Sequence, residues 1–143
     1  MPEVSRSVLV TYSPEQMFAL VDAVERYPEF LPWCGSVKLL HRDERVTRAT
    51  IQINFHGLRQ SFTTDNAKRA PTEMRMALVD GPFRKLEGGW RFIDLGGQGC
   101  KVELELSYEY SSRVLENVVG PVFNRIAATL VEAFVKRAAQ VYG

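Results

Sequence analysis

The chain has 143 residues, with 18 basic and 17 acidic side chains and a formal net charge of +1. That balance argues against the strongly basic class of nucleic-acid-binding proteins, so no DNA partner is expected. Apolar residues make up 45% and charged residues 24%, close to globular averages, which argues against a disordered chain. We expect one domain over residues 1–143 with a core of its own.

The cysteines and the N-terminus favour a cytoplasmic protein. Cys34 and Cys100 form no C-x-x-C pair and lack metal-ligand spacing, as expected of thiols in a reducing compartment. The N-terminal residues MPEVSRSVLV lack the apolar core of a signal peptide. Because no unbroken apolar run approaches the roughly 18 residues that a spanning helix needs, we expect no membrane span. Peripheral contact with the inner membrane stays open.

The first third of the chain predicts a strand and a capped helix. Residues 4–11 are β-branched and favour a strand. Ser13, Pro14 and Gln16 then have the N-cap, N1 and N3 chemistry of a capping box, and apolar residues recur at helical spacing. The Tyr27-Pro28 step should end this helix nearby.

An aromatic segment follows, YPEFLPWC, at residues 27–34. Its two prolines argue against a long helix or a central strand and favour a loop or a single helical turn. Large apolar side chains on such a segment often form the rim of a cavity or a partner surface.

The middle of the chain has the period of two that is typical of strands. The clearest case is 100–110, where apolar and polar residues alternate throughout. Similar patterns predict strands over 46–55, 59–68, 72–79 and 86–95, joined by short turns such as GGQG at 96–99. Gly88 and Gly89 inside the fourth of these segments suggest a bulge or a close backbone approach.

The C-terminal segment has helical periodicity, with a cap at Ser111 or Ser112. Gly120-Pro121 should kink this helix or start a second one. The sequence therefore predicts an α+β fold, in which a curved antiparallel sheet of about seven strands wraps around a long C-terminal helix. The first helix should pack near an end of that helix.

Catalytic chemistry is not evident in the sequence. The two histidines, His41 and His56, should lie near strand ends, and no catalytic, zinc or phosphate-loop motif is present. We expect a binding protein rather than an enzyme, with no metal and no cofactor.

A candidate ligand site lies on the apolar face of the sheet. If Phe62 faces inward, strand parity also turns Thr64 and Asn66 inward, either as polar groups of a ligand site or as core groups bonded to backbone. Other members would be large apolar residues of strands, helix and loops, with Phe30, Trp33 and Phe83 at the rim. The candidate ligand-binding residues are Phe30, Trp33, Phe55, Phe62, Thr64, Asn66, Met74, Met76, Phe83, Trp90, Phe92, Phe123, Ile126 and Leu130.

Two motifs carry a family resemblance. YPEFLPWC at 27–34 and LVDGPFRKLEGGWRF at 78–92, together with the long C-terminal helix, resemble the coenzyme Q-binding START-domain family. This family belongs to the polyketide cyclase/dehydrase-like SRPBCC superfamily and includes the bacterial ribosome association toxin. The resemblance covers nearly the whole chain. A proline at 121 departs from the family's usual pattern and leaves the shape of the last helix open.

The resemblance implies the helix-grip fold and a hydrophobic tunnel between sheet and helix. The first function it implies is binding and chaperoning of an isoprenoid quinone, ubiquinone above all, in support of cellular respiration. The rim aromatics would then meet the bilayer, with Arg26, Arg84 and Lys85 near lipid head groups. The alternative is a ribosome association toxin, of the toxin–antitoxin kind, that binds the large ribosomal subunit and blocks subunit joining. A polyketide cyclase-like enzyme is a third, more distant reading.

Overall fold

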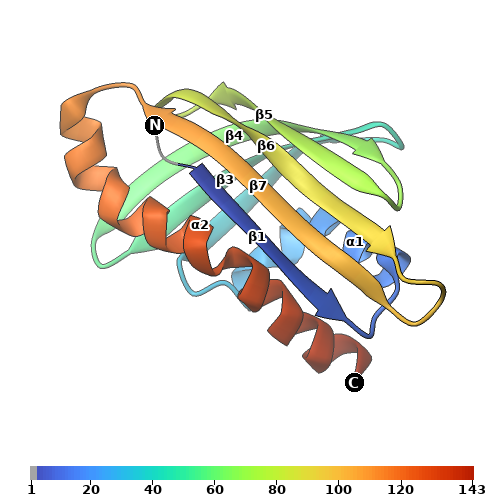
Figure 1. Ribbon diagram of the computed structural model, residues 1–143. Helices are drawn as coiled ribbons and strands as arrows, with labels where there is room; N and C mark the ends of the chain where they lie inside the picture. Colours follow the sequence, from blue (N-terminus) through green and yellow to red (C-terminus); the bar gives the residue numbers. More distant parts are fainter. Residues whose placement is uncertain (1–2) are drawn as a thin grey trace.

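The computed structural model describes residues 3–143 and shows a sheet that curves around one long helix (Figure 1). Within these described residues, seven antiparallel strands lie in the order β1-β7-β6-β5-β4-β3-β2. Their bounds are β1 Glu3–Val10, β2 Cys34–Arg42, β3 Val46–Phe55, β4 Leu58–Arg69, β5 Glu73–Asp80, β6 Phe83–Asp94 and β7 Cys100–Tyr110. The helix-grip fold predicted from the sequence is confirmed.

The first helix starts as predicted but ends sooner. In α1 (Pro14–Asp22) Ser13 and Gln16 form the reciprocal capping box, with both hydrogen bonds present. The predicted end near the Tyr27-Pro28 step is approximate, because α1 stops at Asp22 and the chain passes at Ala23 into a separate 3₁₀ helix, η1 (Val24–Glu29), which contains Pro28.

The C-terminal helix α2 (Arg113–Tyr142) is one element of 30 residues. A second helix starting at Pro121 is not formed, although Figure 1 shows the first turns at an angle to the rest. Ser112 caps the helix through Leu115 N. By length and composition α2 could cross a membrane, but its apolar side, which includes Val119, Phe123 and Phe134, is buried against the sheet.

The core lies between the concave face of the sheet and α2. The alternation predicted for β7 is complete, with Val102, Leu104, Leu106, Tyr108 and Tyr110 all buried. Strand β2 was not located by the sequence analysis. It is an edge strand, and its exposed side chains give no alternation of apolar and polar residues.

The first helix sits against the C-terminal end of α2, as predicted. The Tyr142 hydroxyl donates to the Gln16 carbonyl at 2.9 Å. A polar cluster also ties the end of α1 to the sheet, because Asp22 accepts from Thr47 Oγ1 at 2.8 Å and from the buried Lys68 Nζ at 3.2 Å. This anchoring fixes the end of α1, from which the chain continues through η1 into the aromatic segment 27–34.

Candidate functional site: an apolar cavity and an open groove

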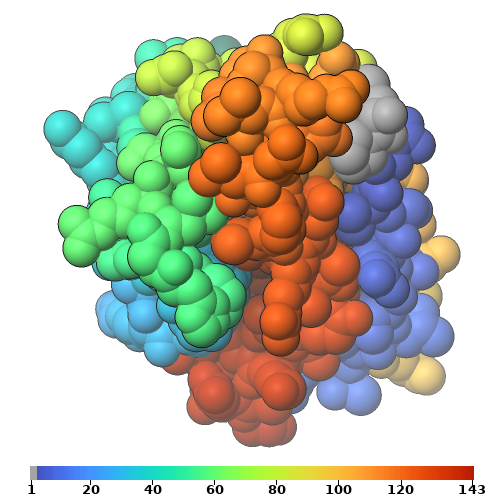
Figure 2. All heavy atoms as spheres, turned by 90° about the vertical axis from the view of Figure 1, so that its left-hand side faces the viewer, coloured from blue at the N-terminus to red at the C-terminus, as the bar shows by residue number. Residues whose placement is uncertain are grey.

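Two hollows adjoin beneath α2. The first is a cavity of about 70 Å³ between the sheet and the helix. The second is an open groove of about 600 Å³ between α2 and the segment 30–33. Trp33 and Ile126 line both and therefore form the wall between them. Figure 2 views the molecule from the end where the first turns of α2 lie near the β3–β4 turn.

The cavity exists because one row of the sheet lacks a side chain. Strand register places Asn66 opposite Met76, Met76 opposite Gly88, and Gly88 opposite Leu106. Gly88 leaves the middle of this row open, while its neighbours line the cavity. The predicted close approach at this glycine is confirmed, since a Cβ there would lie 2.0 Å from the Glu105 carbonyl oxygen.

Two polar side chains face the cavity from β4, as strand parity predicted. Thr64 and Asn66 are 5% and 6% exposed, and the Thr64 hydroxyl donates to Asn66 Oδ1 at 3.0 Å. Asp65 between them points outward and pairs with Arg48 at 2.6 Å. The Thr64 hydroxyl is therefore bonded within the site rather than to backbone. Because it uses the oxygen of the Asn66 amide, the amide nitrogen stays available.

Tyr27 is a cavity residue that the sequence analysis missed. It lines the cavity from η1, and its hydroxyl donates to the Val21 carbonyl. Burial raises the pKa of this phenol above its ordinary value, with the Asp22 carboxylate adding to the shift. Phe134 and Leu106 were also missed as lining residues, although both stand on the apolar face in the sequence pattern.

The aromatic segment 27–34 packs against α2 rather than standing free in solvent. The Phe30 ring lies 5.2 Å from the Phe134 ring, and the Arg137 guanidinium lies 5.0 Å from the centre of Phe30. Arg137 also pairs with Glu29 at 2.7 Å. Phe30 and Trp33 are half-buried, and Leu31 is buried. The segment therefore forms one wall of the groove, which explains its aromatic content.

Most of the predicted ligand-binding residues gather in the two hollows. The cavity brings together Trp33, Phe62, Thr64, Asn66, Met76, Trp90, Phe123, Ile126 and Leu130, and the groove adds Phe30 and Phe55. That these residues bind a ligand stays a prediction.

Three predicted residues lie outside both hollows. Phe83 was placed on a rim loop, but it begins β6, is 5% exposed, and packs 4.8 Å from Phe123 and 5.4 Å from Tyr110. Met74 and Phe92 are buried elsewhere in the core, and the Phe92 ring lies 5.9 Å from Phe18 of α1. A role for Phe83 in touching a bilayer is therefore wrong.

Half of the 18 Lys and Arg side chains pair with carboxylates within residues 3–143. The three proposed head-group contacts are engaged by carboxylates: Arg26 pairs with Glu29, Arg84 with Glu109 and Lys85 with Glu87. Within residues 3–143, the basic residues without an acidic partner are spread over β1, β2, the β2–β3 turn, β4, β5 and α2. They are Arg6, Lys38, Arg45, Arg59, Arg69, Arg75, Arg113, Arg125 and Lys136.

The titratable groups near the site do not suggest metal binding or nucleophilic chemistry. Across the described part of the chain, no three His, Cys, Asp or Glu side chains are arranged to hold a metal. Cys34 is buried at the start of β2, and burial raises the pKa of its thiol to about 11. The cavity therefore offers apolar contact and a few hydrogen bonds, and the groove adds the charged side chains Arg125, Glu132, Lys136 and Arg137.

The fold and the hollow beneath α2 define a protein class. Residues 10–135 match the family described as polyketide cyclase / dehydrase and lipid transport, and the chain belongs to this family. The resemblance stated from the sequence is confirmed. The fold recurs in the solved Zhui aromatase/cyclase from Streptomyces sp. R1128, with a TM-score of 0.81 and 15% identity, over 99% of this chain and 96% of that one.

Within that class the chain is similar to particular bacterial proteins. It is 46% identical to the ribosome association toxin RatA of Vibrio cholerae, over 100% of this chain and 99% of the relative. It is also 30% identical to the mitochondrial coenzyme Q-binding protein COQ10 homolog B of Xenopus laevis, over 99% of this chain and 59% of the relative.

Proposed function

We propose that this protein associates with the ribosome, binding the large subunit and hindering its joining to the small one. The observation that carries the proposal is the 46% identity to a ribosome association toxin along the full length of both chains. This alternative is better supported than quinone binding, for which the identity to the named relative is 30%. Such a role places the protein in the cytoplasm.

The surface constrains how the ribosome would be recognised. The net charge is only +1, and basic residues such as Arg48 and Arg84 are paired with carboxylates, so we expect few phosphate contacts. Recognition would then depend on shape and apolar contact as well as charge.

The test is subunit joining. Purified small and large subunits are mixed with the protein, Mg²⁺ is raised, and the joined fraction is measured on a sucrose gradient. The proposal predicts fewer joined ribosomes as protein is added. Unchanged joining at a several-fold molar excess of folded protein would refute it.

We propose, as a second function, the binding of a hydrophobic ligand, for which an isoprenoid quinone is the leading candidate. The cavity and groove support it. The groove volume of about 600 Å³ lies in the range of about 300–1,000 Å³ typical of ligand sites, whereas the 70 Å³ cavity lies below it. A quinone tail would therefore lie in the groove, and its ring would enter further only if Trp33 or Ile126 moved.

Mass spectrometry of an organic extract from freshly purified protein tests this second function. Met76→Trp fills the cavity from β5, and Val79→Trp changes an exposed residue of the same strand as a control. A stoichiometric quinone is expected from the wild type and from Val79→Trp but not from Met76→Trp. Equal recovery from both variants, or none from the wild type, would count against quinone binding in the cavity.

We further infer a binding protein rather than a cyclase-like enzyme. An acid–base catalyst works best with a pKa near the working pH. Tyr27 lines the cavity, but burial raises its pKa, and its hydroxyl already donates a hydrogen bond to the Val21 carbonyl. A screen of poly-β-ketone substrates for cyclised product would overturn the inference if turnover were found.

A further inference from the structure

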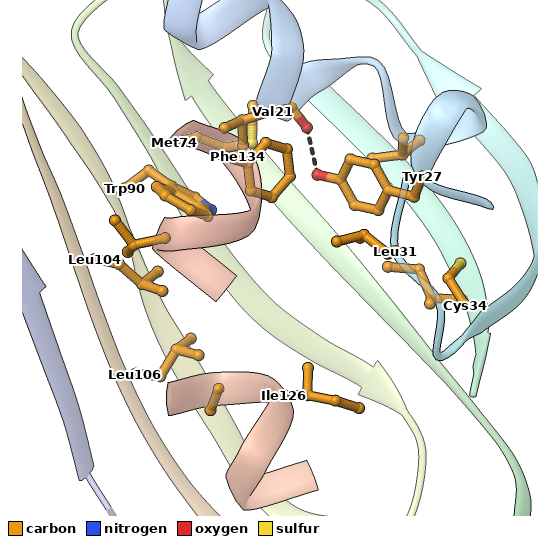
Figure 3. Packing of buried hydrophobic residues seen from close by; sticks show 14 of the residues in the cluster. Val21, Tyr27, Leu31, Cys34, Met74, Trp90, Leu104, Leu106, Ile126 and Phe134 are labelled. Atoms are coloured by element: carbon orange, nitrogen blue, oxygen red, sulfur yellow. Dashed lines mark hydrogen bonds between the residues drawn. The ribbon is translucent and has the colours of Figure 1, made fainter. Parts of the chain in front are cut away.

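Two donor nitrogens of residues that line the cavity make no hydrogen bond within residues 3–143. Thr64 bonds to the oxygen of the Asn66 amide, which leaves the Asn66 nitrogen free, and the indole N–H of Trp90 is also unbonded. Both residues are more than nine-tenths buried, at 6% and 2% exposure. Figure 3 shows the Trp90 nitrogen on the side of the indole that faces α2 and Phe134, whose ring lies 5.3 Å away.

Neither nitrogen is sealed from a water-sized molecule, because within residues 3–143 the only side-chain nitrogen or oxygen that is fully buried without a partner is Glu103 Oε1. A donor that lines a void in this way is open to a hydrogen bond with whatever occupies the void. Tyr27, by contrast, lines the same cavity and is satisfied by the Val21 carbonyl. The protein thus satisfies the hydroxyls of Tyr27 and Thr64 internally but forms no hydrogen bond with the Asn66 and Trp90 nitrogens within residues 3–143.

We propose that the cavity recognises the carbonyl oxygen of its ligand, with Asn66 and Trp90 as the donors that determine specificity. The inference rests on the proposed hydrophobic-ligand function and adds the polarity and orientation of the ligand. The carbonyl end would lie in the cavity and the rest of the ligand in the groove, with Trp33 or Ile126 moving aside to let the adjoining apolar chain pass.

The size of the cavity fits this orientation. Its 70 Å³ equals about two water molecules at the roughly 30 Å³ each occupies in the liquid, or a carbonyl with the carbons attached to it. The remaining lining is mostly apolar, which favours a carbonyl carried on carbon. Two ordered waters are the competing occupant, and the experiment separates the two.

The test compares 2-butanone with 2-methyl-1-butene, in which a methylidene group replaces the oxygen. Each is titrated into ¹⁵N-labelled wild-type protein, and into Trp90→Phe, which keeps a ring but removes the N–H. Nuclear magnetic resonance reports the indole and side-chain amide signals directly. The chain has only two tryptophans, so Trp33→Phe assigns the Trp90 signal.

The ketone is expected to shift the Trp90 indole and Asn66 amide signals downfield, and the alkene is not. Trp90→Phe should weaken the binding affinity for the ketone by about two- to tenfold, which is the net value of one hydrogen bond. The affinity for the alkene should stay within about twofold of the wild-type value. The alkene thereby controls for changes in packing. Asn66→Leu gives a second variant, because it removes the other donor.

Each other result is decisive. Equal losses for ketone and alkene in Trp90→Phe would overturn the carbonyl assignment while leaving hydrophobic binding intact. Long-lived water signals at Trp90 that persist under saturating ketone would assign the donors to water and overturn it as well. If neither compound moved any cavity signal in the wild type, the proposed ligand function itself would fail.

Discussion

Phe134 is the side chain whose removal should most clearly separate packing from binding. It is 1% exposed and lies edge-on to three rings, with centroid distances of 5.4 Å to Tyr27, 5.2 Å to Phe30 and 5.3 Å to Trp90. Phe134→Ala should lower the free energy of unfolding by about 4 kcal/mol, within the 3–5 kcal/mol typical of such truncations. The melting temperature should then fall by about 8–16 °C for a domain of this size.

The same substitution should turn the cavity into a site for a small aromatic compound. Removing the ring adds roughly 100 Å³ to a cavity of 70 Å³, and dry cavities of about 150 Å³ take up benzene. Benzene at several times its Kd should restore about 1 kcal/mol to Phe134→Ala. Phe18→Ala is the matched control, because Phe18 is buried against Phe92 and lies outside the cavity.

Urea unfolding, followed by tryptophan fluorescence with and without benzene, measures both effects. Phe18→Ala should be destabilised without rescue. If Phe134→Ala lowered the free energy of unfolding by less than about 1.5 kcal/mol, α2 would not be packed on the sheet as described. Equal rescue of both variants would show that benzene acts elsewhere.

Four further outcomes follow from the structure. Gly88→Ala should lower the free energy of unfolding in urea by about 2 kcal/mol or more, because φ is +151° and the new Cβ would meet the Glu105 carbonyl. A variant as stable as the wild type would refute the close approach. The Arg42 hydrogen bond lowers the pKa of Glu25, so this pair stabilises the fold above the unfolded pKa of about 4.3 and the contribution is lost as pH falls through the folded pKa. The stability gap between wild type and Arg42→Gln should therefore narrow from pH 6 to pH 3, and a widening gap would contradict the assignment. Cys34, with a thiol pKa of about 11, should be only about one part in a thousand thiolate at pH 8. It should therefore react with a disulfide reagent far more slowly in the folded protein than in urea. Similar reaction rates in the two conditions would show that the Cys34 thiol is exposed. Ribosome affinity should fall less than about a hundredfold between 50 and 200 mM salt, against about 10³–10⁵ for six to ten phosphate contacts, and a steeper fall would reveal a basic face.

Local patterns in the sequence predicted local structure well. The Ser13 and Gln16 cap, the alternation of β7 and the inward direction of Thr64 and Asn66 all follow from chemistry within a few residues. These features depend on period and capping, which short segments determine by themselves.

The features that depended on long-range packing were harder to predict. Phe83 follows Gly-Pro and therefore reads as a loop residue, but contacts with α2 and β7 bury it at the start of β6. The cavity likewise depends on Gly88 lying between Met76 and Leu106, which only strand register determines. Edge strand β2 gave no signal, because one apolar face is needed to produce alternation.

The most direct measurement is co-sedimentation of the purified protein with separated large and small ribosomal subunits. Ribosome association through the large subunit predicts saturable binding to that subunit alone. Protein that stays at the top of both gradients, or that sediments equally with both subunits, would contradict the central proposal.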